Sequence, residues 1–188
     1  MESVVQVPPT KPARQPDTSP TIGTATRRRV LIVEDNVFVA RQCRSALTEA
    51  GYEVIGTLTT ADEAIEVALR QRPDMVLMDI YLRGTRDGID AALEILKQGG
   101  IRSIYASAVS DAGMQARAAL THPLAWLPKP FNDRKLVATV KTALSELDGL
   151  TRSPMNSRTP AAFAQSQTKW RESPRWRSFM DEDKQRGP

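Results

Sequence analysis

The chain has 188 residues, of which 40% are hydrophobic and 26% charged, and it contains a single cysteine, Cys43. That composition supports one ordinary folded domain with chain to spare, and one cysteine excludes a fold held together by internal disulfides. The net charge of +4 is spread unevenly, because residues 30–148 carry 13 Lys and Arg against 16 Asp and Glu, so the central segment lacks the positive charge on which nucleic-acid binding usually depends.

Residues 1–27 are expected to form a disordered N-terminal tail. Five prolines recur there among Thr and Ser without apolar periodicity, so little surface can be buried to offset the entropy of ordering. The N-terminus contains no apolar stretch of signal-peptide length, and no run in the chain approaches the roughly 20 apolar residues that cross a bilayer. Together with the lone cysteine, these features predict a cytoplasmic protein without membrane insertion.

Beyond the tail, short apolar runs alternate with stretches of helical spacing. Residues Val30–Val33 predict a strand that is covered on both faces, and a helix follows until Gly51 ends it. A second strand is expected over Val54–Gly56. Thr60 and Glu63 then form a capping-box pattern that opens the next helix.

The alternation continues to residue 148. Further strands are predicted over Met75–Met78, Ile104–Ala106 and Leu124–Leu127, and further helices over about residues 89–96, 111–120 and 136–147. Five buried strands that alternate with five helices indicate an α/β fold, a doubly wound five-stranded parallel sheet. In such a sheet, ligands bind outside the carboxyl ends of the strands.

Polar side chains end four of the five apolar runs. They are the pair Glu34 and Asp35, then Asp79, Ser107 and Lys129. Carboxylates that converge repel one another, and a hard cation such as Mg²⁺, or alternatively Mn²⁺, relieves that repulsion. One carboxylate can then attack a phosphoryl group, while the lysine and the ion stabilise the transferring oxygens.

These residues lie in motifs that resemble those of the receiver domain of bacterial response regulators, a chemotaxis-type, flavodoxin-like (βα)5 fold. The motifs are Leu31–Asp35, Met78–Ile80 with Asp87-Gly88 downstream, Ser107-Ala108 and Lys129–Phe131. The resemblance covers residues 28–148, and it implies a two-component response regulator whose receiver has no attached effector domain.

The resemblance implies a role for each acidic residue of the predicted site. Asp79 matches the phosphoacceptor. Glu34 and Asp35 match the acid pair that holds Mg²⁺, with Asp35 as the direct ligand and Glu34 acting through water, and the backbone carbonyl of Tyr81 completes the protein ligands. Asp35 could also cap the first helix, so both interpretations stay open here.

Three further positions are implied by the same resemblance. Ser107 matches the hydroxyl that turns toward the phosphoryl group, and Lys129 matches the basic partner. The Lys129-Pro130 peptide is similar to one that is often cis in the family. Trp126 occupies the aromatic switch position, where Tyr or Phe is usual. Each of these residues could instead be an ordinary loop, surface or core side chain.

One stretch departs from the family pattern. Leu82–Gly84 stands where a Met-Pro pair is usual, and the segment from Asp79 to Asp87 is about one residue longer than is common. This difference leaves the expected acceptor in place. We expect the adjoining loop to have an unusual shape.

The resemblance also implies the partners. A sensor histidine kinase is expected to phosphorylate the protein, which then signals through protein contacts, with a histidine phosphotransfer protein or an output protein as further partners. No enzymatic activity is expected beyond self-phosphorylation and autodephosphorylation. Two alternatives stay open, namely a phosphorelay intermediate or sink, and a transcriptional regulator that binds DNA through its basic tails.

Residues 149–188 are expected to be a second disordered tail, with 8 Lys and Arg against 4 Asp and Glu. Ser, Thr, Pro and Gln are frequent in it. Trp170, Trp176 and Phe179 supply large anchors that a protein partner could bury. We therefore expect this tail to contact a protein rather than nucleic acid.

Overall fold

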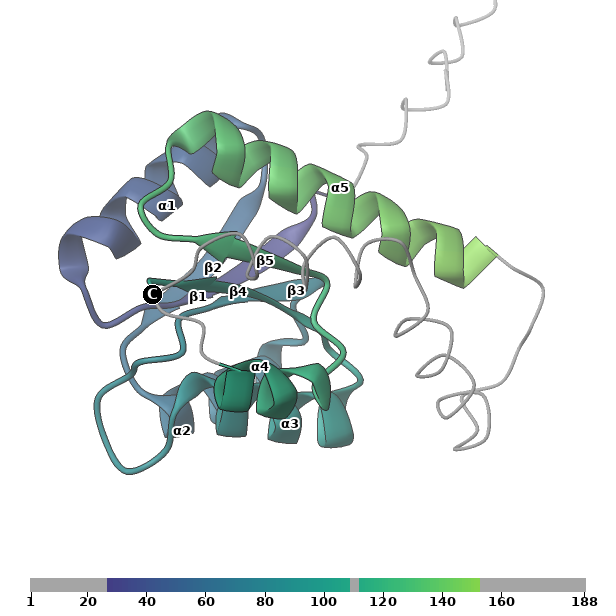
Figure 1. Cartoon of the computed structure of the whole chain (residues 1–188). Helices are drawn as coiled ribbons and strands as arrows, with labels where there is room; N and C mark the ends of the chain where they lie inside the picture. Colours follow the sequence, from purple (N-terminus) through teal and green to yellow (C-terminus); the bar gives the residue numbers. More distant parts are fainter. Residues whose placement is uncertain (1–26, 109–111, 153–188) are drawn as a thin grey trace, which may run out of the picture.

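The structure is a computed structural model, and it describes residues 27–108 and 112–152. A central sheet lies between two layers of helices, with α1 and α5 on one face and α2, α3 and α4 on the other (Figure 1). The predicted N-terminal tail, except for Arg27, lies outside the described residues, as do the predicted C-terminal anchors Trp170, Trp176 and Phe179.

Strands and helices alternate strictly through the described part of the chain. In order they are β1 (Arg29–Val33), α1 (Val37–Glu49), β2 (Glu53–Leu58), α2 (Ala61–Gln71), β3 (Met75–Met78), α3 (Gly88–Gly99), β4 (Ser103–Ser107), α4 (Ala112–Ala119), β5 (Ala125–Pro128) and α5 (Asp133–Arg152). This order confirms the predicted flavodoxin-like (βα)5 fold.

The sheet is parallel throughout, with the strand order β2-β1-β3-β4-β5. The chain therefore moves from β1 outward to β2, and then returns across β1 to β3 on its other side. Because the connections leave β1 and β3 toward opposite faces of the sheet, a crevice opens at their carboxyl ends. Residues that directly follow β1 and β3 are placed at this crevice.

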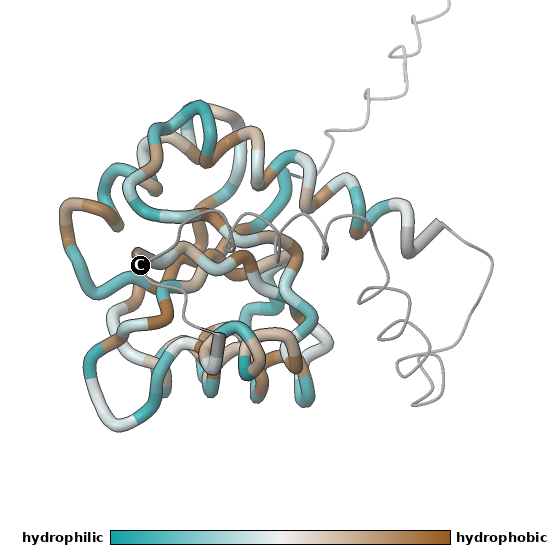
Figure 2. Tube along the Cα trace, viewed as in Figure 1, coloured by the Kyte–Doolittle hydropathy of each residue, from teal (hydrophilic) through white to brown (hydrophobic). Residues whose placement is uncertain are grey.

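The core is divided by the sheet into two apolar layers. Leu31 and Val33 of β1 pack under α2 and α3, whereas Val30 and Ile32 pack under α1 and α5, because successive side chains of a strand point to opposite faces. Figure 2 shows hydrophobic residues concentrated on the strands of the central sheet. Burial on both faces explains why the strands are continuous apolar runs.

Helix starts follow local chemistry. The Asn36 side chain caps α1 and accepts the Phe38 N–H at 3.0 Å, so the cap is Asn36 and not Asp35, which corrects the capping interpretation of Asp35. The predicted capping residue Thr60 is confirmed, since its hydroxyl accepts the Glu63 N–H. Asp35 is thereby left available for another role.

The last helix is longer than the sequence pattern predicts. The predicted receiver ends at residue 148, but α5 continues to Arg152. Leu147 lies partly buried against the core layer beside α1, and the next proline after it is Pro154, so nothing ends the helix at Gly149.

No helix in the described ranges is both long enough and apolar enough to cross a membrane.

Candidate functional site

The acidic residues predicted from the strand ends meet at the carboxyl edge of the sheet. Glu34 and Asp35 follow β1, and Asp79 follows β3. The backbone fixes their positions, because the Asp79 N–H donates to the Val33 carbonyl at 2.8 Å and the Glu34 N–H donates to the Leu58 carbonyl at 2.8 Å. The ladder of the sheet thus extends one residue beyond the strands and holds both acids in register.

These three acids can place one carboxylate oxygen each within 4.8 Å of the others. Glu34 and Asp79 are buried, and Asp35 is partly exposed at the opening. Three negative charges at such distances repel one another by about 1 to 4 kcal/mol per pair, depending on the local dielectric. An arrangement of hard oxygen donors with an open side fits a divalent ion such as Mg²⁺.

Lys129 brings a positive charge to the site from the end of β5, the outermost strand of the sheet. Its Nζ lies 2.6 Å from Glu34 Oε2 and 2.7 Å from Asp79 Oδ2. Its backbone N–H donates to the Ser107 carbonyl at 2.9 Å, just beyond β5. Burial alone would lower the pKa of Lys129, but its hydrogen bonds to Asp79 and Glu34 outweigh that effect and raise the pKa.

One lysine does not neutralise the cluster. The pKa of Glu34 is raised, first because the side chain is buried and then because of the neighbouring Asp79 charge, although the hydrogen bond from Lys129 lowers it in part. The raised pKa means that the ionised Glu34 carboxylate destabilises the folded protein. A further cation beside it would reduce this destabilisation.

The Asp79 carboxylate is also oriented by the backbone. Its Oδ1 accepts the Ile80 N–H at 2.6 Å and the Tyr81 N–H at 3.4 Å. A Cβ placed on Gly88 would lie 1.8 Å from the Asp79 carbonyl oxygen. Glycine is therefore required at position 88, because the start of α3 packs directly on the backbone of Asp79.

Ser107 reaches the same edge of the sheet from β4. Its side chain is buried, and β4 lies between β3 and β5, the strands that lead to Asp79 and Lys129. The strand order thus brings together all the residues predicted from the strand ends. The switch role of Ser107 and the metal-ligand role of the Tyr81 carbonyl stay predictions.

Trp126 lies on β5 opposite Tyr105 of β4. The two rings have centroids 5.4 Å apart and are tilted by 49°. Tyr105 is fully buried, and its hydroxyl lies 2.9 Å from the Thr121 hydroxyl, whereas Trp126 is half-buried. The indole therefore borders the core layer under α4, and its role as a switch stays a prediction.

The Lys129-Pro130 peptide is cis, as expected.

Sequence reasoning gave no role to Arg83, which lies at the opening of the site. Its Nε is 3.7 Å from Asp35 Oδ2. The longer loop after Asp79 was the only sign of it in the sequence. A long exposed side chain carries no periodicity, so its direction could not be read from the pattern.

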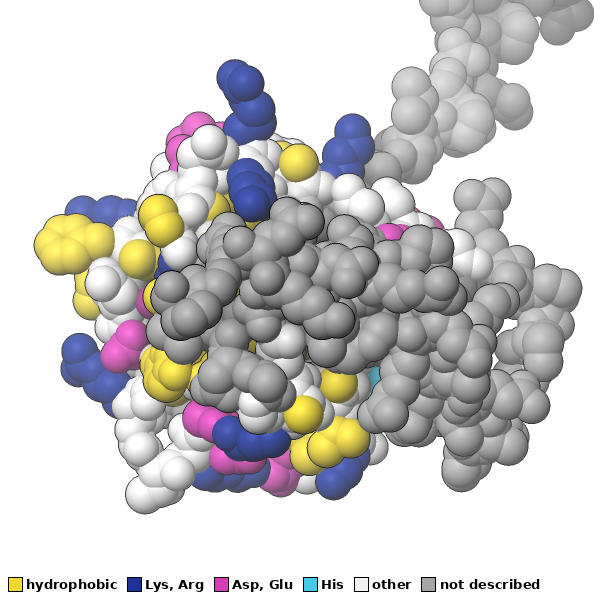
Figure 3. Space-filling view, in the orientation of Figure 1, with side chains coloured by type: hydrophobic (Ala, Val, Ile, Leu, Met, Phe, Trp, Pro, Cys, Tyr) yellow, Lys and Arg dark blue, Asp and Glu magenta, His cyan; other side chains and the backbone are white. Residues whose placement is uncertain are grey.

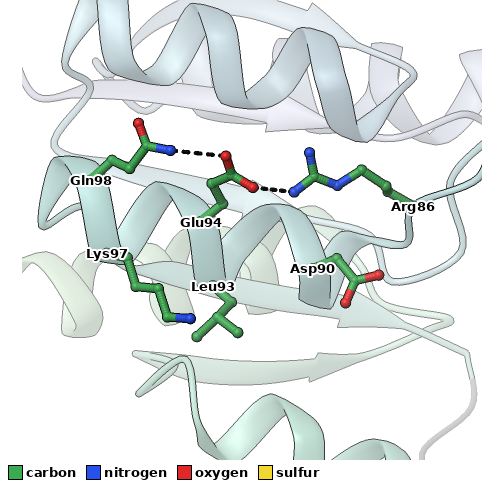
Figure 4. A pocket seen from close by; sticks show the side chains of 6 residues that line it. All are labelled: Arg86, Asp90, Leu93, Glu94, Lys97 and Gln98. Atoms are coloured by element: carbon green, nitrogen blue, oxygen red, sulfur yellow. Dashed lines mark hydrogen bonds and ion pairs between the residues drawn. The ribbon is translucent and has the colours of Figure 1, made fainter.

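The polar pocket on the outer face of α3 is a separate feature. It has a volume of about 330 Å³, and its lining residues are Arg86, Asp90, Leu93, Glu94, Lys97 and Gln98 (Figure 4). Glu94 bonds to both Arg86 and Gln98. Because Glu94 accepts from both Arg86 and Gln98, and Asp90 pairs with Arg117, we assign the pocket no function.

Comparison with known proteins identifies the family. The model of the response regulator receiver domain matches residues 30–141, which is more than half of the chain. The chain therefore belongs to this family, a class of two-component signalling domains.

Individual relatives agree with this assignment. The chain is 35% identical over 127 residues to the transcriptional regulatory protein PdtaR of Mycobacterium tuberculosis, covering 68% of this chain but only 62% of that protein. It is 36% identical over 111 residues to the chemotaxis protein CheY of Thermotoga maritima, covering 58% of this chain and 92% of CheY.

Among solved structures, the signal receiver domain of a modulated diguanylate cyclase from Desulfovibrio desulfuricans G20 superposes with a TM-score of 0.61 at 30% identity. The superposition covers 65% of this chain and 97% of that one. The similarity thus spans a whole receiver domain.

Proposed function

We propose that this receiver is phosphorylated on Asp79 by a histidine kinase, in a reaction that needs Mg²⁺, and that it signals through protein contacts. The observation that carries the proposal is the cluster of Glu34, Asp35 and Asp79 with Lys129 at hydrogen-bond distance from two of the acids. An oriented carboxylate, an opening and a lysine are the parts that phosphoryl transfer to a carboxylate requires.

The residues present fit a divalent ion. The Asp35 and Asp79 carboxylates would hold it directly, Glu34 would act through water, and the Tyr81 carbonyl would complete the protein ligands. When bound, the ion would neutralise charge on the transferring phosphoryl oxygens. The raised pKa of Glu34, caused first by burial, is consistent with a site that gains from an added cation.

The transfer itself is a displacement at phosphorus. One Asp79 oxygen forms a bond to phosphorus, while the bond from phosphorus to the donor atom breaks and the donor keeps the electron pair. That donor atom is an imidazole nitrogen in a phosphohistidine or an acyl oxygen in acetyl phosphate. The Ile80 and Tyr81 N–H groups hold the carboxylate in place, and the Lys129 ammonium balances charge on the phosphoryl oxygens.

A protein donor is supported by the surface beside the site. Val37 and Phe38, at the start of α1, are 65% and 84% exposed, and Figure 3 shows hydrophobic side chains gathered over this end of α1. Large exposed apolar side chains next to a reactive group are typical of a protein contact. We infer that the phosphorylated kinase, or a histidine phosphotransfer protein, docks here.

Intact-mass spectrometry after incubation with acetyl phosphate tests the acceptor. The wild type should gain one labile phosphate when Mg²⁺ or Mn²⁺ is present and none when the ions are chelated. Asp79→Asn should gain none. Asp74→Asn is the matched control, because Asp74 bonds to Arg28 at the opposite edge of the sheet, and it should be labelled like the wild type. Full labelling of Asp79→Asn would refute the assignment.

Phe38→Ala tests the donor surface separately. It should slow transfer from a phosphorylated histidine protein at least about tenfold, as loss of a buried interface anchor would, but leave labelling by acetyl phosphate unchanged. Equal rates from the protein donor would place its docking surface elsewhere.

A further inference from the structure

The loop that departs from the family pattern holds Arg83 over the acidic site. Leu82 packs against the core layer under α2 and α3, and the backbone of Arg83 pairs with Thr60 in an isolated parallel bridge. Gly84 follows with a φ of +112°, a conformation that favours glycine. The residue is therefore fixed on both sides, by a buried side chain before it and a turn after it.

The fixed backbone leaves the Arg83 side chain free to reach Asp35. The side chain is 73% exposed, and its Nε lies 3.7 Å from Asp35 Oδ2. This is the only ion pair of Asp35 among the described residues, because Lys129 contacts Glu34 and Asp79 instead. Lys129 therefore pairs with Glu34 and Asp79, and Arg83 pairs with Asp35.

We propose that Arg83 competes with the divalent cation for Asp35 and so sets the metal affinity of the site. The inference rests on the proposed function, since it takes Asp35 as a metal ligand. Without the ion, the guanidinium pairs with the Asp35 carboxylate that the ion needs. Binding of the ion displaces the guanidinium to solvent, and the lost ion pair reduces the affinity that three carboxylates would otherwise give.

The expected size of the effect follows from the exposure of the pair. An ion pair with one side chain this exposed contributes little, up to about 1 kcal/mol, because water and salt screen it. Loss of the competitor should therefore tighten Mg²⁺ binding by about three- to fivefold and no more. Arg83 adjusts the affinity without blocking the site.

Isothermal titration calorimetry with Mg²⁺ on the 188-residue chain measures this affinity directly. Arg83→Gln should bind Mg²⁺ about three- to fivefold more tightly than the wild type, and Arg83→Lys, which keeps the cation, should stay close to the wild type. Arg70→Gln is the matched control, because it makes the same change in net charge on the outer face of α2, where Arg70 pairs with Glu66. It should leave the affinity unchanged.

Salt gives a second readout that a merely structural role would not produce. The difference between Arg83→Gln and the wild type should shrink as ionic strength rises from about 0.05 to about 0.5 M, because exposed charges are screened. An unchanged or weaker affinity for Arg83→Gln, or an equal gain in Arg70→Gln, would overturn the proposal.

Asp35→Asn separates this proposal from the proposed function. If the wild type binds Mg²⁺, Asp35→Asn does not, and Arg83→Gln equals the wild type, then the competition fails while the metal site stands. If the wild type itself binds no Mg²⁺, the metal-dependent function fails together with the competition.

Discussion

The two edges of the sheet both carry charged clusters, but they treat the charges differently. At the carboxyl edge, the side chains of Glu34, Asp79 and Lys129 are 4%, 8% and 17% exposed. At the amino edge, Arg28 bonds to Asp74 at 2.8 Å and also to Asp148, and these side chains are 29% to 47% exposed. Both clusters have more acidic than basic side chains, but the first is buried and the second is solvated.

The difference in burial suggests that the carboxyl-edge cluster serves function and that the amino-edge cluster serves the stability of the fold. Removing charges from water costs several kcal/mol per ion, so a buried cluster with unbalanced charge is a poor means of stabilising a fold. Its presence at the carboxyl edge of the sheet therefore supports the proposed function rather than a role in stability. The amino-edge cluster joins the start of β1 to the residue before β3 and to α5, and its desolvation cost is small.

The largest expected effect comes from Gly88→Ala. Its new Cβ would lie 1.8 Å from the Asp79 carbonyl oxygen, so the backbone of α3 or of Asp79 must move, and we expect a loss of about 3 kcal/mol in the free energy of unfolding. Urea denaturation measures it. Gly149→Ala in α5 has nothing within 4 Å and should gain up to about 1 kcal/mol. A tolerated Gly88→Ala would contradict the close packing.

Lys129→Met should have the next largest effect. It leaves Glu34 and Asp79 buried without their cation, and we expect a destabilisation of about 2 to 3 kcal/mol in metal-free protein, less than a fully buried pair would lose. Arg28→Met, the counterpart at the amino edge, should lose no more than about 1 kcal/mol. Equal losses in urea denaturation would mean that burial does not distinguish the two edges.

A smaller effect concerns the pH dependence of stability, for which Glu34 and Asp87 should have opposite signs. The folded pKa of Glu34 is raised, chiefly by burial, so the folded state binds its proton more readily than the unfolded state. The cost is fully present above the folded pKa, decreases as pH falls through it, and is gone below the lower pKa of the unfolded state. In metal-free protein, Glu34→Gln should therefore be more stable than the wild type near neutral pH, and the gap should close on acidification.

Asp87 should behave in the reverse way. Burial by itself raises its pKa, but the hydrogen bond from Arg117, at 2.7 Å, and the N–H groups at the start of α3 outweigh this and lower the pKa. Its contribution is present above the unfolded pKa and is lost as pH falls through the folded pKa. Asp87→Asn should be less stable than the wild type near neutral pH and converge with it in acid. Thermal unfolding across pH 4 to 7, about the range where carboxyls titrate, tests both signs; parallel curves would contradict them.

The smallest expected effect is optical. In a Trp170→Phe, Trp176→Phe background, the remaining Trp126 lies against Tyr105. Beryllofluoride is a mimic of the phosphoryl group. Its addition with Mg²⁺ should change the Trp126 fluorescence if Ser107 and Lys129 couple phosphorylation to a change in β4 and β5. Ser107→Ala should still accept phosphate but lose most of the change. An unchanged Trp126 signal in the parent would show that this coupling is absent.

The sequence by itself determined the fold and the main residues of the site. Apolar runs mark strands buried on both faces, helical spacing marks the layers that cover them, and a parallel sheet collects the polar strand-end residues at one edge. Glu34, Asp35, Asp79, Ser107 and Lys129 could therefore be placed together from the pattern of residues alone. Each of these inferences depends on local pattern and on a rule that holds for the whole class of sheet.

Only the tertiary structure decided which side chains meet across the loops. The pairing of Arg83 with Asp35, the bond of Arg28 to Asp148 across 120 positions of sequence, and the approach of Gly88 to Asp79 all depend on how separate elements pack. Long side chains on irregular backbone carry no periodicity, and several partners are within their reach. The packing of the separate elements decides which of these partners lies within reach.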